Sequence, residues 1–253
     1  GAVFLSAATA STILRDAVNV PGSIRANTVG THAGKIVIGG GSGGRVNITG
    51  RLVANGGRRA AGGSINVAGA AVHASGKITA SGALGGNVKI ASTGDLTLSG
   101  KIAATGGTGK GGAIDLTGAN IKAIGALIDA SGAAGGGTVR IGGGYQGTGD
   151  LAHAQAVSID SASVVRADAT SSGNGGAVVV WSDGATKVSG AFSAKGGANG
   201  GNGGVVETSG HTLEFAGTHV NTSAAKGHAG TWLLDPADLI IDTAAAATIS
   251  GTR

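Results

Sequence analysis

Short runs of alternating apolar and polar residues recur along the whole chain, and each run ends in Gly, Asn or Ser. A phrase of the form small-Gly-x-apolar-x-apolar starts at Ala33, Gly62, Gly85, Gly111, Gly136, Gly175, Gly203 and Ala229, and the opening GAVFLS fits it too. Successive starts lie 23 to 39 residues apart. A period of this length indicates a repeat architecture.

Each repeat carries two further apolar runs, such as RVNITG and RLVANG, so one unit predicts three short strands. An isolated unit buries roughly six aliphatic side chains, worth about 1.5–3 kcal/mol each. Ordering its backbone costs about 1–2 kcal/mol for each of roughly 25 residues, so an isolated unit does not fold. Stacking satisfies both the backbone and the inner face. We therefore expect an all-β parallel β-helix solenoid of about nine coils, with three strands per coil, forming a single domain over residues 1–253.

The alignment of the units predicts which residues lie side by side. Lys89, Asp115 and Arg140 share one outward position in three successive first strands. We expect them to form a plus-minus-plus column with neighbouring Cβ atoms about 5 Å apart. Glycines at the corners are expected to allow backbone conformations that other residues resist, and to let coils sit close together.

The longest unit, between Gly136 and Gly175, contains an insertion loop at about 142–156. It carries Tyr145, the only Tyr of the chain, and His153. Insertions in solenoids form loops on one face and are often binding sites, which makes these two residues candidate ligand contacts. The alternative is a solvated loop without a ligand.

Composition excludes several classes of protein. There are 53 Gly but only 2 Pro, which fits neither collagen nor Pro-rich disorder. The absence of Cys excludes disulfides and thiolate chemistry. The net charge is +5, but the basic residues are scattered, so no nucleic-acid partner is expected. No apolar run is long enough for a membrane-spanning helix, so no membrane insertion is expected.

One group of basic residues does follow the repeat. Arg51, Lys77 and Lys101 begin three consecutive third strands and predict a positive stripe, which acidic or sulfated glycans would fit. The alternative is that the three cations repel one another mildly and are simply hydrated.

The residue types that support catalysis are sparse. The 13 Asp and Glu are dispersed, and no nucleophile, base and orienting group converge in the sequence. None of the 6 His has metal-ligand spacing, so neither a metal nor a cofactor is expected. The Thr residues do not form the repeated ranks of an ice-binding face. We expect a protein that is not an enzyme.

Several longer segments resemble the filamentous-haemagglutinin-like exoproteins, the large secreted partners of bacterial two-partner secretion. They are GGGTVRIGGGYQGTGDLAHAQ, GGAVVVWSDGATKVSG, GGNGGVVETSGHTLEFAG and GHAGTWLLDPADLII. The most specific parts are the turn Trp181-Ser182-Asp183 and the run Trp232, Leu233, Leu234, Asp235 and Pro236. Both Trp side chains are expected to cover or cap coils, with sugar stacking as the less favoured alternative.

The resemblance implies a right-handed β-helix that is exported through an outer-membrane pore and acts in adhesion, biofilm or surface structure. It places the protein outside a Gram-negative cell or on its surface. The secretion domain of such proteins, with its Asn-Pro-Asn-Gly-type motif, is not matched, and the matched motifs are structural, so no receptor-binding residue carries over.

These expectations combine into one functional hypothesis. The opening GAVFLS predicts a first strand and ATISG, close to Arg253, a third strand, so the coils form nearly a whole number. Unpaired strand edges favour further pairing, which predicts head-to-tail contact with a second copy. The hypothesis is the structural shaft of a secreted or cell-surface adhesin that self-assembles into an extracellular filament. The alternative is a glycan-binding β-helix module that uses the basic stripe or the Tyr145 loop.

Overall fold

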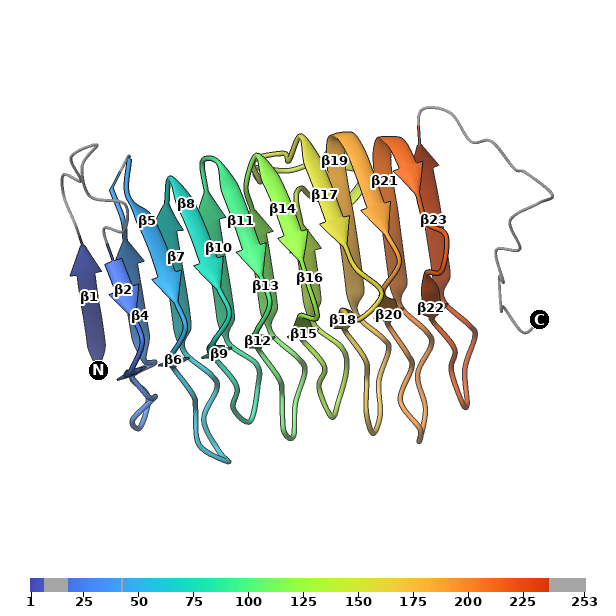
Figure 1. Cartoon of the computed structure of the whole chain (residues 1–253). Helices are drawn as coiled ribbons and strands as arrows, with labels where there is room; N and C mark the ends of the chain where they lie inside the picture. Colours follow the sequence, from blue (N-terminus) through green and yellow to red (C-terminus); the bar gives the residue numbers. More distant parts are fainter. Residues whose placement is uncertain (7–17, 42, 237–253) are drawn as a thin grey trace.

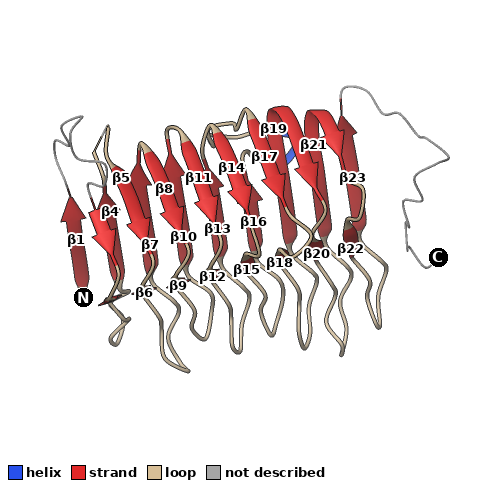
Figure 2. Ribbon diagram, in the orientation of Figure 1, coloured by secondary structure: helices blue, strands red, loops and turns tan. Residues whose placement is uncertain are grey.

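The computed structural model describes residues 1–6, 18–41 and 43–236, and over these residues the chain winds into a parallel β-solenoid (Figure 1). β1 and β23 lie at opposite ends of the rod. Strands and loops account for nearly all of it, and Figure 2 shows one short helical element, η1 (Tyr145–Gly147), in the described part.

Each turn contributes three strands, and each strand pairs in parallel with its counterparts in the neighbouring turns. The first strands are β1 (Ala2–Ser6), β4 (Lys35–Gly39), β7 (Ser64–Gly69), β10 (Asn87–Ser92), β13 (Ala113–Thr117), β16 (Thr138–Ile141), the first parts of β19 (Ala177–Val188) and β21 (Val205–Glu214), and β23 (Thr231–Pro236). The second strands are β2 (Val18–Val20), β5 (Arg45–Ile48), β8 (Ala71–Ala74), β11 (Asp95–Leu98), β14 (Asn120–Ala123), β17 (Ala156–Ile159) and the second parts of β19 and β21. The third strands are β3 (Ser23–Arg25), β6 (Arg51–Val53), β9 (Lys77–Thr79), β12 (Lys101–Ala103), β15 (Leu127–Asp129), β18 (Val164–Arg166), β20 (Ala191–Ser193) and β22 (His219–Asn221).

The predicted fold class is confirmed. The described residues form about eight turns, with β23 beginning a further one, close to the predicted nine. At about 4.8 Å per rung, eight steps give a rod roughly 38 Å long. The strand predicted at ATISG lies outside the described residues.

The core is a set of stacked aliphatic columns, because alternate side chains of every strand point inward. One column runs through Ile36, Ile65, Val88, Ile114, Val139, Val178 and Val206, all at most 1% exposed. The fully buried Phe192 fills the interior from β20. The alternation read from the sequence is therefore the pattern that builds the core.

The predicted register of the first strands is also confirmed. Lys89 pairs with Asp115, and Asp115 pairs with Arg140. The guanidinium of Arg140 donates from Nε to Oδ1 of Asp115 at 2.7 Å and from Nη2 to Oδ2 at 2.9 Å. The column therefore contains a two-pronged ion pair across adjacent turns.

Glycine-rich loops connect each third strand to the next first strand, and Figure 1 shows them projecting side by side along one edge of the rod. We call them the loop stack: residues 26–34, 54–63, 80–86, 104–112, 130–137, 167–176, 194–204 and 222–230. They hydrogen-bond to one another, for example from Gly82 N to Thr105 O at 3.1 Å and from Gly106 N to Ser131 O at 3.0 Å. The loops thus continue the ladder beyond the strands.

The last glycine of each loop occupies the same place in every turn. This glycine ladder comprises Gly34, Gly63, Gly86, Gly112, Gly137, Gly176, Gly204 and Gly230. A Cβ atom on any member after the first would lie 1.9–2.1 Å from the carbonyl oxygen of the preceding member. None of these residues has a positive φ. Close approach of the backbones, rather than unusual conformation, therefore requires glycine at these positions.

Candidate functional site

The insertion occupies residues 142–155, between β16 and β17, and it packs against β19 and β21. Its η1 element contains Gln146 with φ 50, the only non-glycine residue with positive φ in the described chain. The backbone N–H of Gln146 donates to both carboxylate oxygens of Glu207 on β21 at 3.0 Å. The loop is thereby tied to a strand 61 residues away.

Glu207 is a fully buried carboxylate on the outward side of β21, beneath this loop. Ser209 Oγ donates a further hydrogen bond to it at 2.8 Å. Burial raises the pKa of Glu207, and the nearby charge of Asp235 acts in the same direction, while the hydrogen bonds from Gln146 and Ser209 oppose the shift. This carboxylate acts as an internal anchor for the loop, since its oxygens already have partners.

Trp181 lies under the same loop. A Cβ on Gly143 or Gly147 would lie 2.7 Å or 2.6 Å from its ring atoms, so the loop backbone rests directly on the indole. Its Nε1 donates to Asp183 Oδ1 at 3.2 Å, and His153 Nδ1 lies 2.9 Å from the same oxygen. His153 therefore fastens the end of the loop to β19.

Trp181, Ser182 and Asp183, expected to form a turn, lie inside β19 where it passes from a first strand to a second strand. The pairing with β21 shifts register between Ser182 and Ala185. Ser182 is buried and its Oγ lies 2.8 Å from Thr186 Oγ1. Thr186 Oγ1 also donates to the carbonyl oxygen of Ser209 at 2.7 Å, so this buried hydroxyl pair is bonded to the next turn.

The run Trp232 to Pro236 forms β23, whose Trp232 packs against the core. The Trp232 and Phe215 rings pack edge-to-face with their centroids 6.0 Å apart, and Trp232 Nε1 donates to Thr208 Oγ1 at 3.0 Å. Leu233 and Leu234 pair with Glu207 and Thr208, and Asp235 pairs with Ser209. In the described chain, Trp232 covers the interior of the turn formed by β21.

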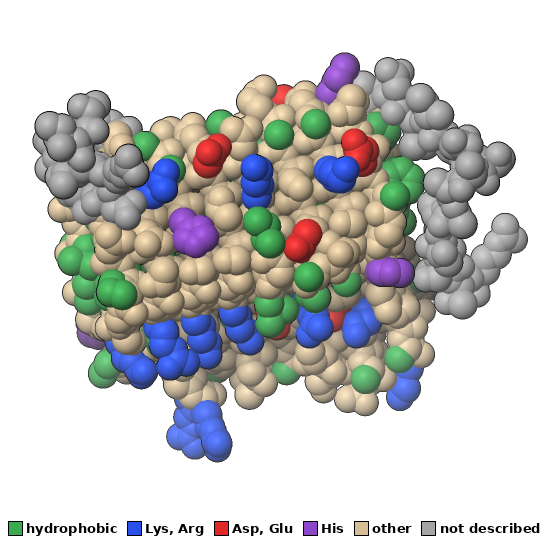
Figure 3. All heavy atoms as spheres, viewed as in Figure 1, with side chains coloured by type: hydrophobic (Ala, Val, Ile, Leu, Met, Phe, Trp, Pro, Cys, Tyr) green, Lys and Arg blue, Asp and Glu red, His purple; other side chains and the backbone are tan. Residues whose placement is uncertain are grey.

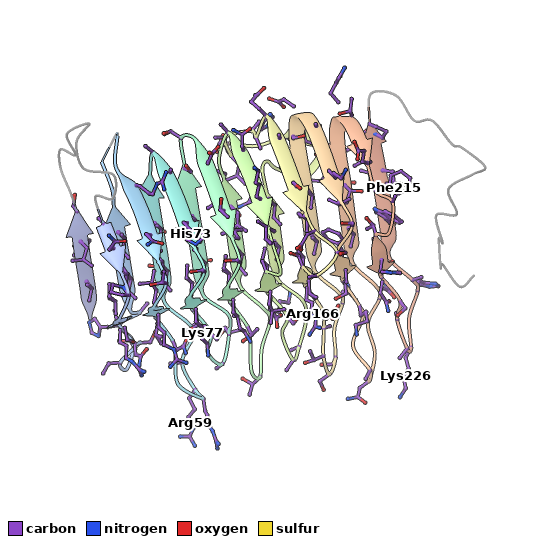
Figure 4. The ribbon with its side chains drawn as sticks, viewed as in Figure 1. Arg59, His73, Lys77, Arg166, Phe215 and Lys226 are labelled. Carbon is purple, nitrogen blue, oxygen red and sulfur yellow. The ribbon has the colours of Figure 1, made fainter. Side chains whose placement is uncertain are left out.

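The basic stripe has the predicted register. Arg51 pairs with Lys77, and Lys77 pairs with Lys101. Within the described residues no ion pair involves these three side chains. Figure 3 shows Lys and Arg side chains gathered in a band over the third strands, and Figure 4 places Lys77 and Arg166 along it. Stacked cations about 4.8 Å apart repel one another and would bind a polyanion favourably.

The candidate ligand residues do not form one site. Tyr145 is exposed in the insertion loop, while its carbonyl oxygen accepts hydrogen bonds from Thr148 N and Oγ1 at 3.0 and 2.7 Å. Tyr145 and His153 belong to the loop over the first strands, whereas Arg51, Lys77 and Lys101 lie on the third strands. Any ligand of the loop and any ligand of the stripe would therefore contact different faces.

Within residues 1–6, 18–41 and 43–236 no three His, Asp or Glu side chains gather as they would around a metal ion. Helices with the length and apolarity to cross a bilayer do not occur in that same part of the chain.

No protein-family profile matches this sequence, and no curated protein matches it. A search of solved structures finds the HMW1 secretion domain from Haemophilus influenzae, with a TM-score of 0.61 and 24% sequence identity. The match covers 84% of this chain and 63% of that chain. At this identity the likeness shows a shared β-solenoid fold.

Proposed function

We propose that this chain is a shaft segment of a secreted or cell-surface bacterial adhesin, with a structural rather than a catalytic role. The observation that carries the proposal is the parallel ladder of first strands from β1 to β23, in which each strand pairs with its counterparts in the neighbouring turns. Such a stack forms an extended rod, which is what projecting a binding tip away from a cell surface needs.

Two likenesses support an exported protein. The segments around Trp181 and Trp232 resemble the filamentous-haemagglutinin-like exoproteins, and one solved structure with the same fold is named a secretion domain. We propose export of the precursor through an outer-membrane pore of two-partner secretion in a Gram-negative bacterium. The absence of Cys fits a rod that backbone pairing and packing hold together outside the cell.

We further propose that copies stack head to tail, since parallel strand edges favour continued pairing. Electron microscopy of the isolated chain across a concentration series tests this. Long fibres with an axial repeat near the length of one chain would support a filament built from its own ends. Dispersed rods at every concentration would contradict self-assembly and leave the single shaft segment. Compact globular particles would contradict the shaft itself.

The basic stripe favours a second candidate function, weak binding of acidic or sulfated glycans at the cell surface or in the matrix. Its three side chains are in register and lack acidic partners within the described residues. Salt-dependent retention on a heparin column, reduced in Lys77→Glu, is the expected result. Retention that responds to neither salt nor this substitution would refute it.

A further inference from the structure

A groove crosses the last three third strands and runs onto the loop stack. One hollow of about 470 Å³ is lined from β18, β20 and β22. A second hollow, of about 390 Å³, is lined by the loops that follow, and both include Asp168 and Lys195. We call the joined hollows the third-sheet groove. No residue expected from the sequence to bind a ligand lies in it.

Two cationic side chains, Arg166 and Lys195, are exposed and line this groove. On the adjacent strand, Asp129 pairs in register with Arg166, and its Oδ1 accepts a hydrogen bond from Ser131 N at 2.9 Å. Among the described residues, the one acid that lines either hollow is Asp168, whose side chain is 10% exposed. Its oxygens accept from Ser193 Oγ at 3.0 Å and Lys195 N at 2.7 Å, with Lys195 Nζ at 3.6 Å. The acid is thus used inside the fold, whereas the guanidinium of Arg166 has no ion pair within the described residues.

Two outward columns, two residues apart on the same strands, cross the groove. Val164, Ala191 and His219 pair in register along one column, in which Val164 and Ala191 are apolar. Arg166, Ser193 and Asn221 pair in register along the other. A pyranose ring has an apolar C–H face and hydroxyl edges, and a uronic acid adds a carboxylate that a guanidinium binds with two hydrogen bonds.

We propose that the third-sheet groove binds an acidic oligosaccharide built from uronic acid units. Val164 and Ala191 take the ring faces, Arg166 takes a carboxylate, and Lys195 and Asn221 bind the neighbouring polar groups. The combined hollows have the volume of a ligand larger than one monosaccharide.

An extended acidic peptide is an alternative polyanionic ligand for this groove, but the strand pairing disfavours it. Peptides that add to a sheet use free backbone groups at an edge. β18 is already paired with β15 and β20, and β20 with β18 and β22. Across β18 and β20, recognition therefore depends on side chains, which suits a sugar, whereas β22 is the end strand of this sheet in the described residues and pairs with β20 alone.

This inference goes beyond the second candidate function, because the third-sheet groove is a different site from the basic stripe, and it is independent of the shaft. The test is calorimetric titration of the whole chain with tetragalacturonate. Arg166→Ala should weaken binding by about tenfold or more, because a charged two-pronged hydrogen bond is lost. Arg59→Ala, at the tip of a projecting loop (Figure 4), is the matched control and should bind as the unsubstituted chain does. Arg166→Ala should also keep the same unfolding temperature, since its exposed side chain has no ion pair in the described structure.

Three outcomes would overturn the inference. They are unchanged affinity in Arg166→Ala, equal affinity for tetraglutamate, and an equal loss in Lys77→Ala. If heparin retention depends on Lys77 but the affinity for tetragalacturonate does not depend on Arg166, the inference fails and the glycan-binding candidate function stands. If neither dependence is found, the inference and the glycan-binding candidate function are both refuted. The shaft proposal is tested separately by electron microscopy.

Discussion

The glycine ladder makes a quantitative prediction for Gly112→Ala. The added Cβ would lie 1.9 Å from the carbonyl oxygen of Gly86, whereas ordinary contact begins at 3.4 Å. The two turns would have to separate locally by about 1.5 Å to accommodate it. The Gly86 oxygen cannot simply move, because it accepts the hydrogen bond from Ala113 N at 3.0 Å.

We therefore expect Gly112→Ala to lower the free energy of unfolding by about 3 kcal/mol, the upper end of the cost of overpacking, with the loss of a rung hydrogen bond included. Urea unfolding followed by far-UV circular dichroism measures the change. Amide hydrogen exchange at Ala113 should accelerate in the same variant, because the hydrogen bond from Ala113 N to the Gly86 carbonyl oxygen is the one that opens.

Gly57→Ala is the matched control, because no heavy atom lies within 4 Å of a Cβ at that position and its φ is not positive. Its unfolding midpoint should stay close to that of the unsubstituted chain. Equal stability of the two variants would refute the explanation of the ladder by close approach.

Three further changes test the core, the charged column and the loop anchor. Phe192→Ala removes a side chain only 1% exposed and should lower the free energy of unfolding by about 3–5 kcal/mol; a change below about 1 kcal/mol in urea unfolding would contradict the packing. Asp115→Ala breaks a pair whose Arg140 side chain is 37% exposed, so a double-mutant cycle should give about 1 kcal/mol or less, and zero coupling would show that the pair contributes nothing. Burial raises the pKa of Glu207 above its value in the unfolded chain. The stabilisation of the fold that results from this shift is therefore fully present below the unfolded pKa and is lost as pH rises through the folded pKa. Glu207→Gln keeps an acceptor for Gln146 N–H, so urea midpoints measured from acid to neutral pH should lose this dependence; an unchanged pH profile would exclude Glu207 as its source.

The repeat and its register could be predicted because both are local properties of the sequence. Alternation in KIVI or NVKI fixes which side chains point inward, and equal spacing fixes which residues stack. This is why Lys89, Asp115 and Arg140 were placed correctly. Of the two roles expected of the glycines, close approach of neighbouring coils is the one found at the end of each loop, and positive φ is not found there.

The position of the insertion loop could be predicted from the sequence, but its contacts could not. Its position between β16 and β17 agrees with the gap in the repeat, but its attachment to Glu207 spans 61 residues and leaves no periodic signal. A lone Glu at an outward position in VVETSG was the only indication. Arg166 and Lys195 were missed for a similar reason, because the groove exists only once three turns are stacked.

The glycine ladder also bears on how the length of such a rod can change. Each turn from Gly63 to Gly137 presents the same spacing and the same hydrogen-bonding edge to the turns on either side. A whole turn is therefore an exchangeable unit, and removal of one would join two compatible edges. The segment from β16 to β21 differs, because the insertion loop joins its turns through Glu207 and Asp183. Deletion or duplication of a whole turn should accordingly be tolerated in the first part of the rod and should disrupt the second part. The length of the rod could therefore change through its N-terminal half alone.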